Sequence, residues 1–201
     1  IKAGLGLSDL AIGGIVGMRQ VASGAANVPA GIFTDMFRRR VALMLTFSMA
    51  CLTAGYLFVG ISPWYWLILL SVTISGAGTA TWHAPAFATL AERYPNRRAL
   101  AMAMHRSGGS IGDTTAPIIV GLLLGGISFW GLNWGGFGWR TVALIHVPPS
   151  ALTALIILAT FKSPGRTAAE QISFASYLAA TRPLFRNAGV LSMVAMHATR
   201  G

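Results

Sequence analysis

Long apolar stretches separated by short polar connections dominate the sequence. Membrane-spanning helices need roughly 20 apolar residues, and five stretches reach that length: 10–33, 41–61, 64–90, 99–129 and 139–161. A sixth stretch begins near Ala188 and is cut short by the end of the sequence. The runs are too long for strands and lack the alternation of period two that a transmembrane barrel requires. The pattern therefore predicts an all-α membrane protein.

Basic residues gather in every second connection between these stretches. Arg38–Arg40 follow the first stretch, and the other basic connections contain Arg93, Arg97 and Arg98 and, further on, Lys162, Arg166, Arg182 and Arg186. The intervening connections are nearly free of charge, and the longer one, 129–139, is rich in Trp, Phe and Gly. Because positive loops stay on the cytoplasmic side, we expect the basic connections to be cytoplasmic in a multi-pass protein of the cell membrane or bacterial inner membrane.

Composition supports the membrane assignment and excludes other classes. Charged residues make up 10% of the chain, against roughly 25% in soluble domains, which leaves too few to cover a surface in water. The net charge of +10 could suggest nucleic acid, but the bases lie between apolar runs and do not alternate with stacking aromatics. A single cysteine, Cys51, excludes an internal disulfide and a cysteine-based metal site.

The polar connection 162–187 marks a boundary between two parts of the chain. We expect residues 1–161 to form one helical bundle and residues 188–201 to start a second. Within the connection, Ile172, Ala175 and Leu178 recur at helical spacing, which predicts either a short helix on the cytoplasmic membrane surface or a solvated linker. Since the sequence begins with Ile1 and stops inside an apolar run, it is expected to be a piece of a longer chain.

Two polar turns carry a resemblance to a known family. Gly31, Asp35, Arg39 and Arg40 resemble the signature loop between the second and third helices of major facilitator superfamily transporters. The turn 92–98 is similar to the family's matching turn after the fourth helix, and Gly138-Trp139-Arg140 to the start of its sixth. The resemblance covers nearly the whole chain. It implies the N-terminal helical bundle of that fold, with helices 2–6 complete, helix 1 missing and helix 7 truncated.

The same resemblance implies a conformational gate at the basic turns, formed by Gly31, Asp35, Arg39, Arg40, Glu92 and Arg93. A carboxylate such as Asp35 can hold bases or a helix N-terminus at the membrane face, and in the family such contacts form in one access state and break in the other. Met36 and Arg38 stand where the family has a base and a glycine, so the motif alone does not define the strength of the latch. The alternative is that Arg38–Arg40 only set the topology.

Ionisable residues inside the apolar stretches are candidates for a substrate or proton pathway, because burying them in a membrane is costly. The candidates are Arg19, His83, His105, Arg106 and Asp113. Arg106 and Asp113 lie seven residues apart and so share a helix face about two turns apart. Arg106 could receive an anionic solute or snorkel to the interface. Asp113 could bind a proton or a cationic group, and each residue, like Arg19, could instead only pair with a neighbouring helix. His146 is expected to pack between helices.

The stretch around Asp113 also resembles the fifth-helix antiporter motif of the family. Gly112, Pro117 and Gly121 match it, whereas Ala116 and Val120 replace two glycines. The motif implies an exporter that exchanges its substrate for protons. The pair Trp82-His83 and the run 107–113 are similar to fosmidomycin-resistance-type exporters within the superfamily.

The predicted function is secondary transport by alternating access, with a site at mid-membrane between this bundle and a second one. A proton-coupled exporter of a small drug-like or anionic solute is the first hypothesis, and an importer of an organic acid or other metabolite is the second. A membrane-embedded enzyme is a remote alternative, since the sequence lacks a nucleophile elbow, metal-ligand spacing and a phosphate loop. No cofactor and no metal is expected. The expected partners are the bilayer, a small solute, protons and the C-terminal bundle of the same chain.

Overall fold

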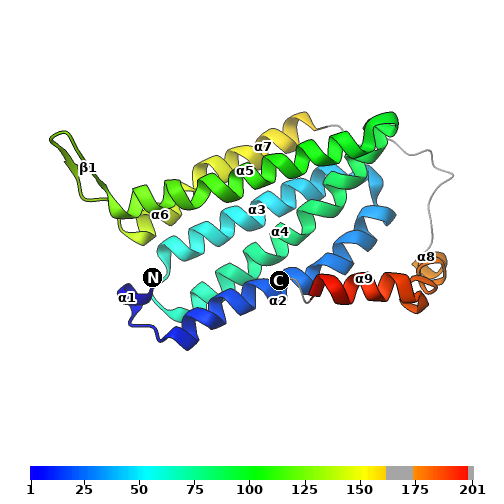
Figure 1. The fold of residues 1–201 in the computed structure, drawn as a ribbon, viewed down its shortest axis with the longest axis horizontal. Coiled ribbons are helices and arrows are strands. Elements are labelled where there is room, and N and C mark those ends of the chain that lie inside the picture. The colour runs from blue at the N-terminus through cyan, green and yellow to red at the C-terminus, as the bar shows by residue number, and fades with distance from the viewer. Residues whose placement is uncertain (162–173, 199–201) are drawn as a thin grey trace. The chain divides into compact units, whose positions relative to one another are not determined.

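The computed structural model describes residues 1–161 and 174–198 and divides the chain into two compact units, Ile1–Gly165 and Arg166–Gly201. The larger unit is a bundle of long helices with one short hairpin (Figure 1). Its elements are α1 (Lys2–Leu5), α2 (Asp9–Met36), η1 (Arg38–Arg40), α3 (Val41–Ile61), α4 (Tyr65–Arg93), η2 (Pro95–Arg97), α5 (Arg98–Gly125), β1 (Ile127–Phe129), β2 (Leu132–Trp134), α6 (Trp139–Ile145) and α7 (Val147–Thr160).

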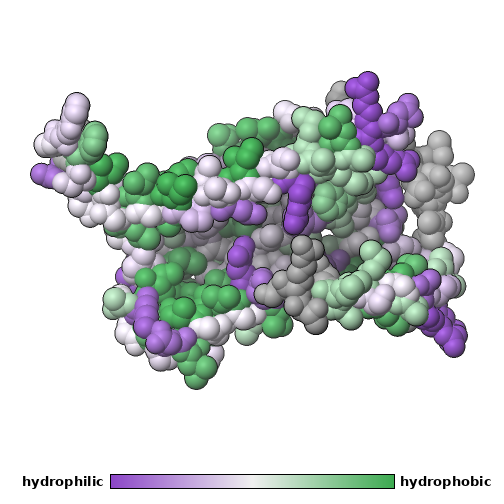
Figure 2. Space-filling view, viewed as in Figure 1, coloured by the Kyte–Doolittle hydropathy of each residue, from purple (hydrophilic) through white to green (hydrophobic). Residues whose placement is uncertain are grey.

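The all-α membrane bundle predicted from the sequence is confirmed. Among the described residues, three helical segments are long and apolar enough to cross a membrane, namely Arg38–Ile61, Pro95–Gly125 and Trp139–Thr160. α2 and α4 have the length, at 28 and 29 residues, but are not among these three segments. The space-filling view shows hydrophobic residues over α6 and α7, more hydrophilic residues along the middle of α5, and a hydrophilic group where α4 turns into α5 (Figure 2).

Helix α4 packs against both α2 and α3, and small residues bring the backbones together. Gly76 of α4 lies against the backbone of Arg19 in α2, where an added Cβ would come within 2.5 Å of the Arg19 carbonyl oxygen. Ser48 of α3 is fully buried and donates a hydrogen bond to the carbonyl of Gly78 at 2.5 Å. Without a hydrophobic force between helices in lipid, close packing and such hydrogen bonds hold a bundle together.

Replacing Gly78 with alanine is expected to destabilise the bundle. The new Cβ would lie 2.5 Å from Cys51 Cβ and 3.0 Å from the Ser48 carbonyl oxygen, and such overpacking costs about 1–3 kcal/mol. Gly17→Ala is the matched control, because among the described residues nothing lies within 4 Å of its added Cβ. Thermal unfolding of the full-length protein in detergent should show a lower midpoint for Gly78→Ala only. Equal midpoints would contradict the packing argument.

The predicted end of the stretch 99–129 is wrong, because α5 ends at Gly125 and a hairpin follows. Gly126 has φ 73°, which a helix cannot continue, and β1 pairs antiparallel with β2. β1 lies inside the predicted stretch and β2 in the aromatic connection that follows it, and the sequence analysis expected no strand in either. Figure 1 shows it projecting away from the helices at the end of α5.

The predicted stretch 139–161 is divided at His146 into α6 and α7. Val147 is followed by Pro148 and Pro149, which have no backbone N–H to donate, so the first helix cannot continue unbroken. The ring Nδ1 of His146 lies 2.7 Å from the Val142 carbonyl oxygen, and the ring packs on Tyr56 of α3, with 5.2 Å between centroids. His146 thus sits between helices as the sequence predicted.

The smaller unit contains α8 (Phe174–Thr181), η4 (Leu184–Arg186) and α9 (Ala188–Ala198). Asn187 caps α9, since its Oδ1 accepts hydrogen bonds from the backbone N–H groups of Gly189 and Val190 at 2.9 and 3.2 Å. Asparagine favours this position because its side chain satisfies donors that a helix start leaves free. Part of the predicted linker, including Lys162, Arg166 and Ile172, lies outside the described residues. The assignment of 162–187 as a linker and of 188–201 as the start of a second bundle stays a prediction.

Candidate functional site

A polar cavity of about 310 Å³ lies between α4 and α5. Four of the five pathway residues predicted from the sequence line it: His83 from α4, and His105, Arg106 and Asp113 from α5. Thr79, Phe87, Gly109 and Ser110 complete the lining. The structure therefore brings together side chains that lie up to 34 positions apart in the sequence. Their role in transport stays a prediction.

Phe87 connects the two histidines of this cavity. Its ring stacks on His83, with 6.0 Å between centroids, and meets His105 edge to face at 5.4 Å. An aromatic face attracts cations, so the ring can receive either imidazole in its protonated form. Sequence reasoning missed Phe87, although its position four residues after His83 places both on one face of a helix.

Arg106 and Asp113 lie on the same side of α5, as their spacing predicted, and both contribute to the cavity wall. Within the described ranges 1–161 and 174–198, neither residue forms an ion pair. Their axial separation of about 10 Å explains this, since each residue of a helix advances the chain by about 1.5 Å. A cavity with a guanidinium at one level and a carboxylate at another can hold an anionic group and a proton separately.

Arg19 does not line this cavity. It lies on α2 with an exposed side chain, and its backbone forms the contact with Gly76 described above. The structure thus separates Arg19 from the other four candidates, and its assignment to the pathway stays a prediction.

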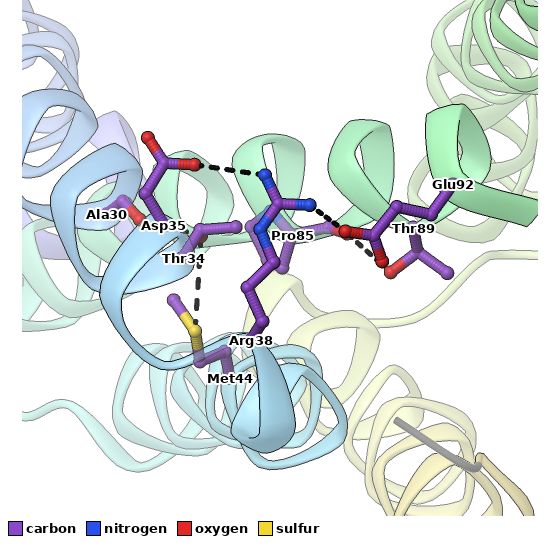
Figure 3. A network of polar contacts seen from close by, with 8 residues as sticks. All are labelled: Ala30, Thr34, Asp35, Arg38, Met44, Pro85, Thr89 and Glu92. Carbon is purple, nitrogen blue, oxygen red and sulfur yellow. Dashed lines mark hydrogen bonds and ion pairs between the residues drawn. The ribbon is translucent and has the colours of Figure 1, made fainter. Parts of the chain in front are cut away.

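A second polar cluster lies at the end of the bundle that carries Arg38–Arg40 and the turn after α4, here called the basic end. Arg38 reaches Asp35 at the end of α2, with 3.4 Å between Nη2 and Oδ1. Its other nitrogen, Nη1, binds Oε1 of Glu92 at the end of α4. Figure 3 shows the guanidinium between the two carboxylates. One cation therefore connects the end of α2 with the end of α4, across the 54 positions that separate Arg38 from Glu92.

Arg38 is the residue of this cluster that sequence reasoning missed. Arg38 departs from the family signature, in which a glycine usually stands at this position. The signal that could have revealed it is its spacing of three residues from Asp35, which suits an ion pair at a helix end. Its Nε is buried without a hydrogen-bond partner among the described residues, so the two carboxylates satisfy only the outer nitrogens of the guanidinium.

The remaining gate candidates surround this cluster. Arg40 lies over the ring of Phe37, at 5.9 Å from its centroid, and Arg93 over Phe161 at 5.0 Å. Arg39 is exposed, and Gly31 lies within α2 with open space around it among the described residues. Two predicted gate residues, Asp35 and Glu92, thus meet through Arg38. The gating role of the whole set stays a prediction.

The candidate helix-packing motif lies on the exposed surface of α5. Pro117 is inside the helix, and an added Cβ at Gly112 or Gly121 would meet no atom of the described residues within 4 Å. Within the described part of the chain, α5 has no buried residue. At these glycines, α5 therefore has room for another helix to pack closely. The packing role of the motif stays a prediction.

In the part of the chain that the structure describes, no group of three or more His, Cys, Asp or Glu side chains could hold a metal ion. His83, His105 and Asp113 are the residues of the polar cavity that could exchange protons.

Comparison with known proteins gives one family. The sequence model of the family described as the Major Facilitator Superfamily matches residues 1–199, nearly the entire chain. No curated protein and no solved structure matches the chain.

Proposed function

Because this chain belongs to the Major Facilitator Superfamily and is thus a membrane transporter rather than an enzyme, we propose that it moves a small anionic or drug-like solute outward in exchange for protons. The proposal includes alternating access against a C-terminal bundle and a topology with the basic end in the cytoplasm. The observation that carries it is the cavity between α4 and α5. Three basic side chains, His83, His105 and Arg106, and the carboxylate of Asp113 line this cavity.

The chemistry of the cavity supports an anionic solute. Arg106 offers a planar array of donors that matches carboxylate or phosphate oxygens, and His83 and His105 add donors whose charge depends on pH. Gly109 and Ser110 leave room on the α5 wall. The similarity of Trp82-His83 and of the run 107–113 to fosmidomycin-resistance-type exporters points to a phosphonate as the first solute to test.

Asp113 is the proposed proton carrier of the exchange. It lies about two turns along α5 from Arg106 and has no ion-pair partner in the described ranges, so its charge can change without breaking a salt bridge. Binding of the anion near Arg106 and release of a proton from Asp113 would then occur in one cavity. This arrangement supports an exchange of an anion for protons.

The test is flux of fosmidomycin through the full-length protein in proteoliposomes under an imposed proton gradient. The wild type should accelerate efflux when the gradient is applied. Asp113→Asn should lower gradient-driven flux at least tenfold. Solute exchange measured in the absence of a gradient should be unchanged in this variant. Asp9→Asn is the matched control, because Asp9 is exposed at the start of α2 and pairs with Lys2.

Two outcomes would change the proposal. Flux indifferent to both the gradient and Asp113→Asn would exclude proton coupling. Accumulation of the solute in the direction of the proton flow would support the importer and exclude the exporter.

A further inference from the structure

A second cavity lies at the basic end between α2 and α3. Its walls are mostly apolar, whereas ionisable side chains line the cavity between α4 and α5. The volume of the second cavity is about 500 Å³. Its walls include Pro29, Phe33 and Phe37 on the α2 side and Leu43 and Phe47 on α3. Phe33 and Phe47 are 54% and 58% exposed, so the cavity opens at the surface of the bundle.

Arg40 is the one charged residue that lines this cavity in the described structure. Its guanidinium lies over the Phe37 ring, at 5.9 Å from the centroid. No carboxylate of residues 1–161 or 174–198 forms an ion pair with it. An apolar cavity with one cation at its edge suits a ligand that has an apolar chain and an anionic head.

The position of Arg40 relative to α3 sets the depth of this cavity in a membrane. α3 begins at Val41 and has 21 residues, a length of about 32 Å that matches the hydrocarbon core of a bilayer. Arg40 therefore lies at the headgroup level. Leu43 and Phe47 follow about 5 and 10 Å deeper along the helix axis. The cavity thus extends from the headgroups into the acyl layer.

We propose that this cavity binds an anionic phospholipid of the leaflet at the basic end, with one acyl chain between α2 and α3 and the phosphate at Arg40. The charge of the cavity favours a lipid, because it offers one cation at the headgroup level beside apolar walls. Basic pockets between membrane helices bind anionic headgroups in this manner. The site is separate from the proposed solute pathway.

The experiment is native mass spectrometry of the full-length protein in detergent, titrated with phosphatidylglycerol or phosphatidylcholine of the same acyl chains. The wild type should bind the anionic lipid more tightly. Arg40→Gln should weaken phosphatidylglycerol binding about fivefold and remove the preference, since one base near the membrane surface contributes about that factor. Arg40→Lys should retain the preference. Arg98→Gln, an equal change of charge on exposed α5 outside the cavity, should leave binding unchanged.

A second variant tests the apolar part of the site. Ala26 lines the cavity and is half-buried, so Ala26→Phe should narrow the cavity and weaken binding of both lipids. Equal affinities of the two lipids for the wild type, or no effect of Arg40→Gln, would overturn the proposal. It would also fail if Leu43→Cys, in a Cys51→Ser background, resists an apolar maleimide before lipid is added, because another segment would then cover the cavity.

Discussion

Replacing Arg106 with glutamine is expected to lower transport of an anionic solute by about 10- to 100-fold, mainly through a higher KM. Hydrogen bonds to a charged group contribute about 1.5–3 kcal/mol, which corresponds to that range of affinity. Arg106 lines the polar cavity beside His105, and within residues 1–161 and 174–198 it forms no ion pair. The measurement is the concentration dependence of solute flux in proteoliposomes.

Matched variants separate recognition of the anion from a structural role. Arg106→Lys keeps the charge but loses the planar pair of donors, so its KM should lie between those of the wild type and Arg106→Gln. Arg98→Gln removes a charge two turns earlier on α5, outside the cavity lining, and should behave as the wild type. If Arg106 only snorkels to the interface, all three variants would give the same KM. A cationic solute transported better by Arg106→Gln would reverse the assigned charge of the substrate.

Loss of Arg38 is expected to weaken the basic end of the bundle. Arg38→Gln leaves the carboxylates of Asp35 and Glu92 without the cation that lies between them. Because the three side chains are 22%, 43% and 33% exposed, solvent screens part of the interaction. We therefore expect a loss of only about 1 kcal/mol for the pair with Glu92, seen as a lower thermal midpoint of the full-length protein in detergent.

A double-mutant cycle isolates this pair. Glu92→Gln in the Arg38→Gln background should restore part of the lost stability, because it removes one of two like charges. Arg38→Gly, which introduces the residue usual in the family signature, should resemble Arg38→Gln. Additive effects of Arg38→Gln and Glu92→Gln would show that the ion pair contributes nothing. The same variants in the flux assay test the proposed gate, since a latch that holds one access state should change the rate of transport when it is removed.

The two clusters were foreseen to different degrees. The position of Arg106 and Asp113 on one helix face follows from their spacing alone, because a helix repeats every 3.6 residues. The contribution of His83 and Phe87 does not, because it depends on where α4 lies beside α5. At the basic end, the family signature indicates Asp35 and the matching turn indicates Glu92, whereas Arg38 stands where the signature has a glycine and leaves the strength of the latch undefined. Its part as the connecting cation appears only when the ends of α2 and α4 are brought together.

The sequence by itself determined the membrane class, the family and most helix positions, because apolar length, basic turns and local motifs are properties of neighbouring residues. It did not determine the hairpin after Gly125 or the division at His146, where local backbone geometry interrupts an apolar run. Only the tertiary structure decided which charges meet. The polar cavity, the Asp35–Arg38–Glu92 cluster and the apolar cavity at Arg40 each combine residues from different helices. At the cluster, the ends of α2 and α4 can meet because small residues such as Gly76 let these two helices approach closely.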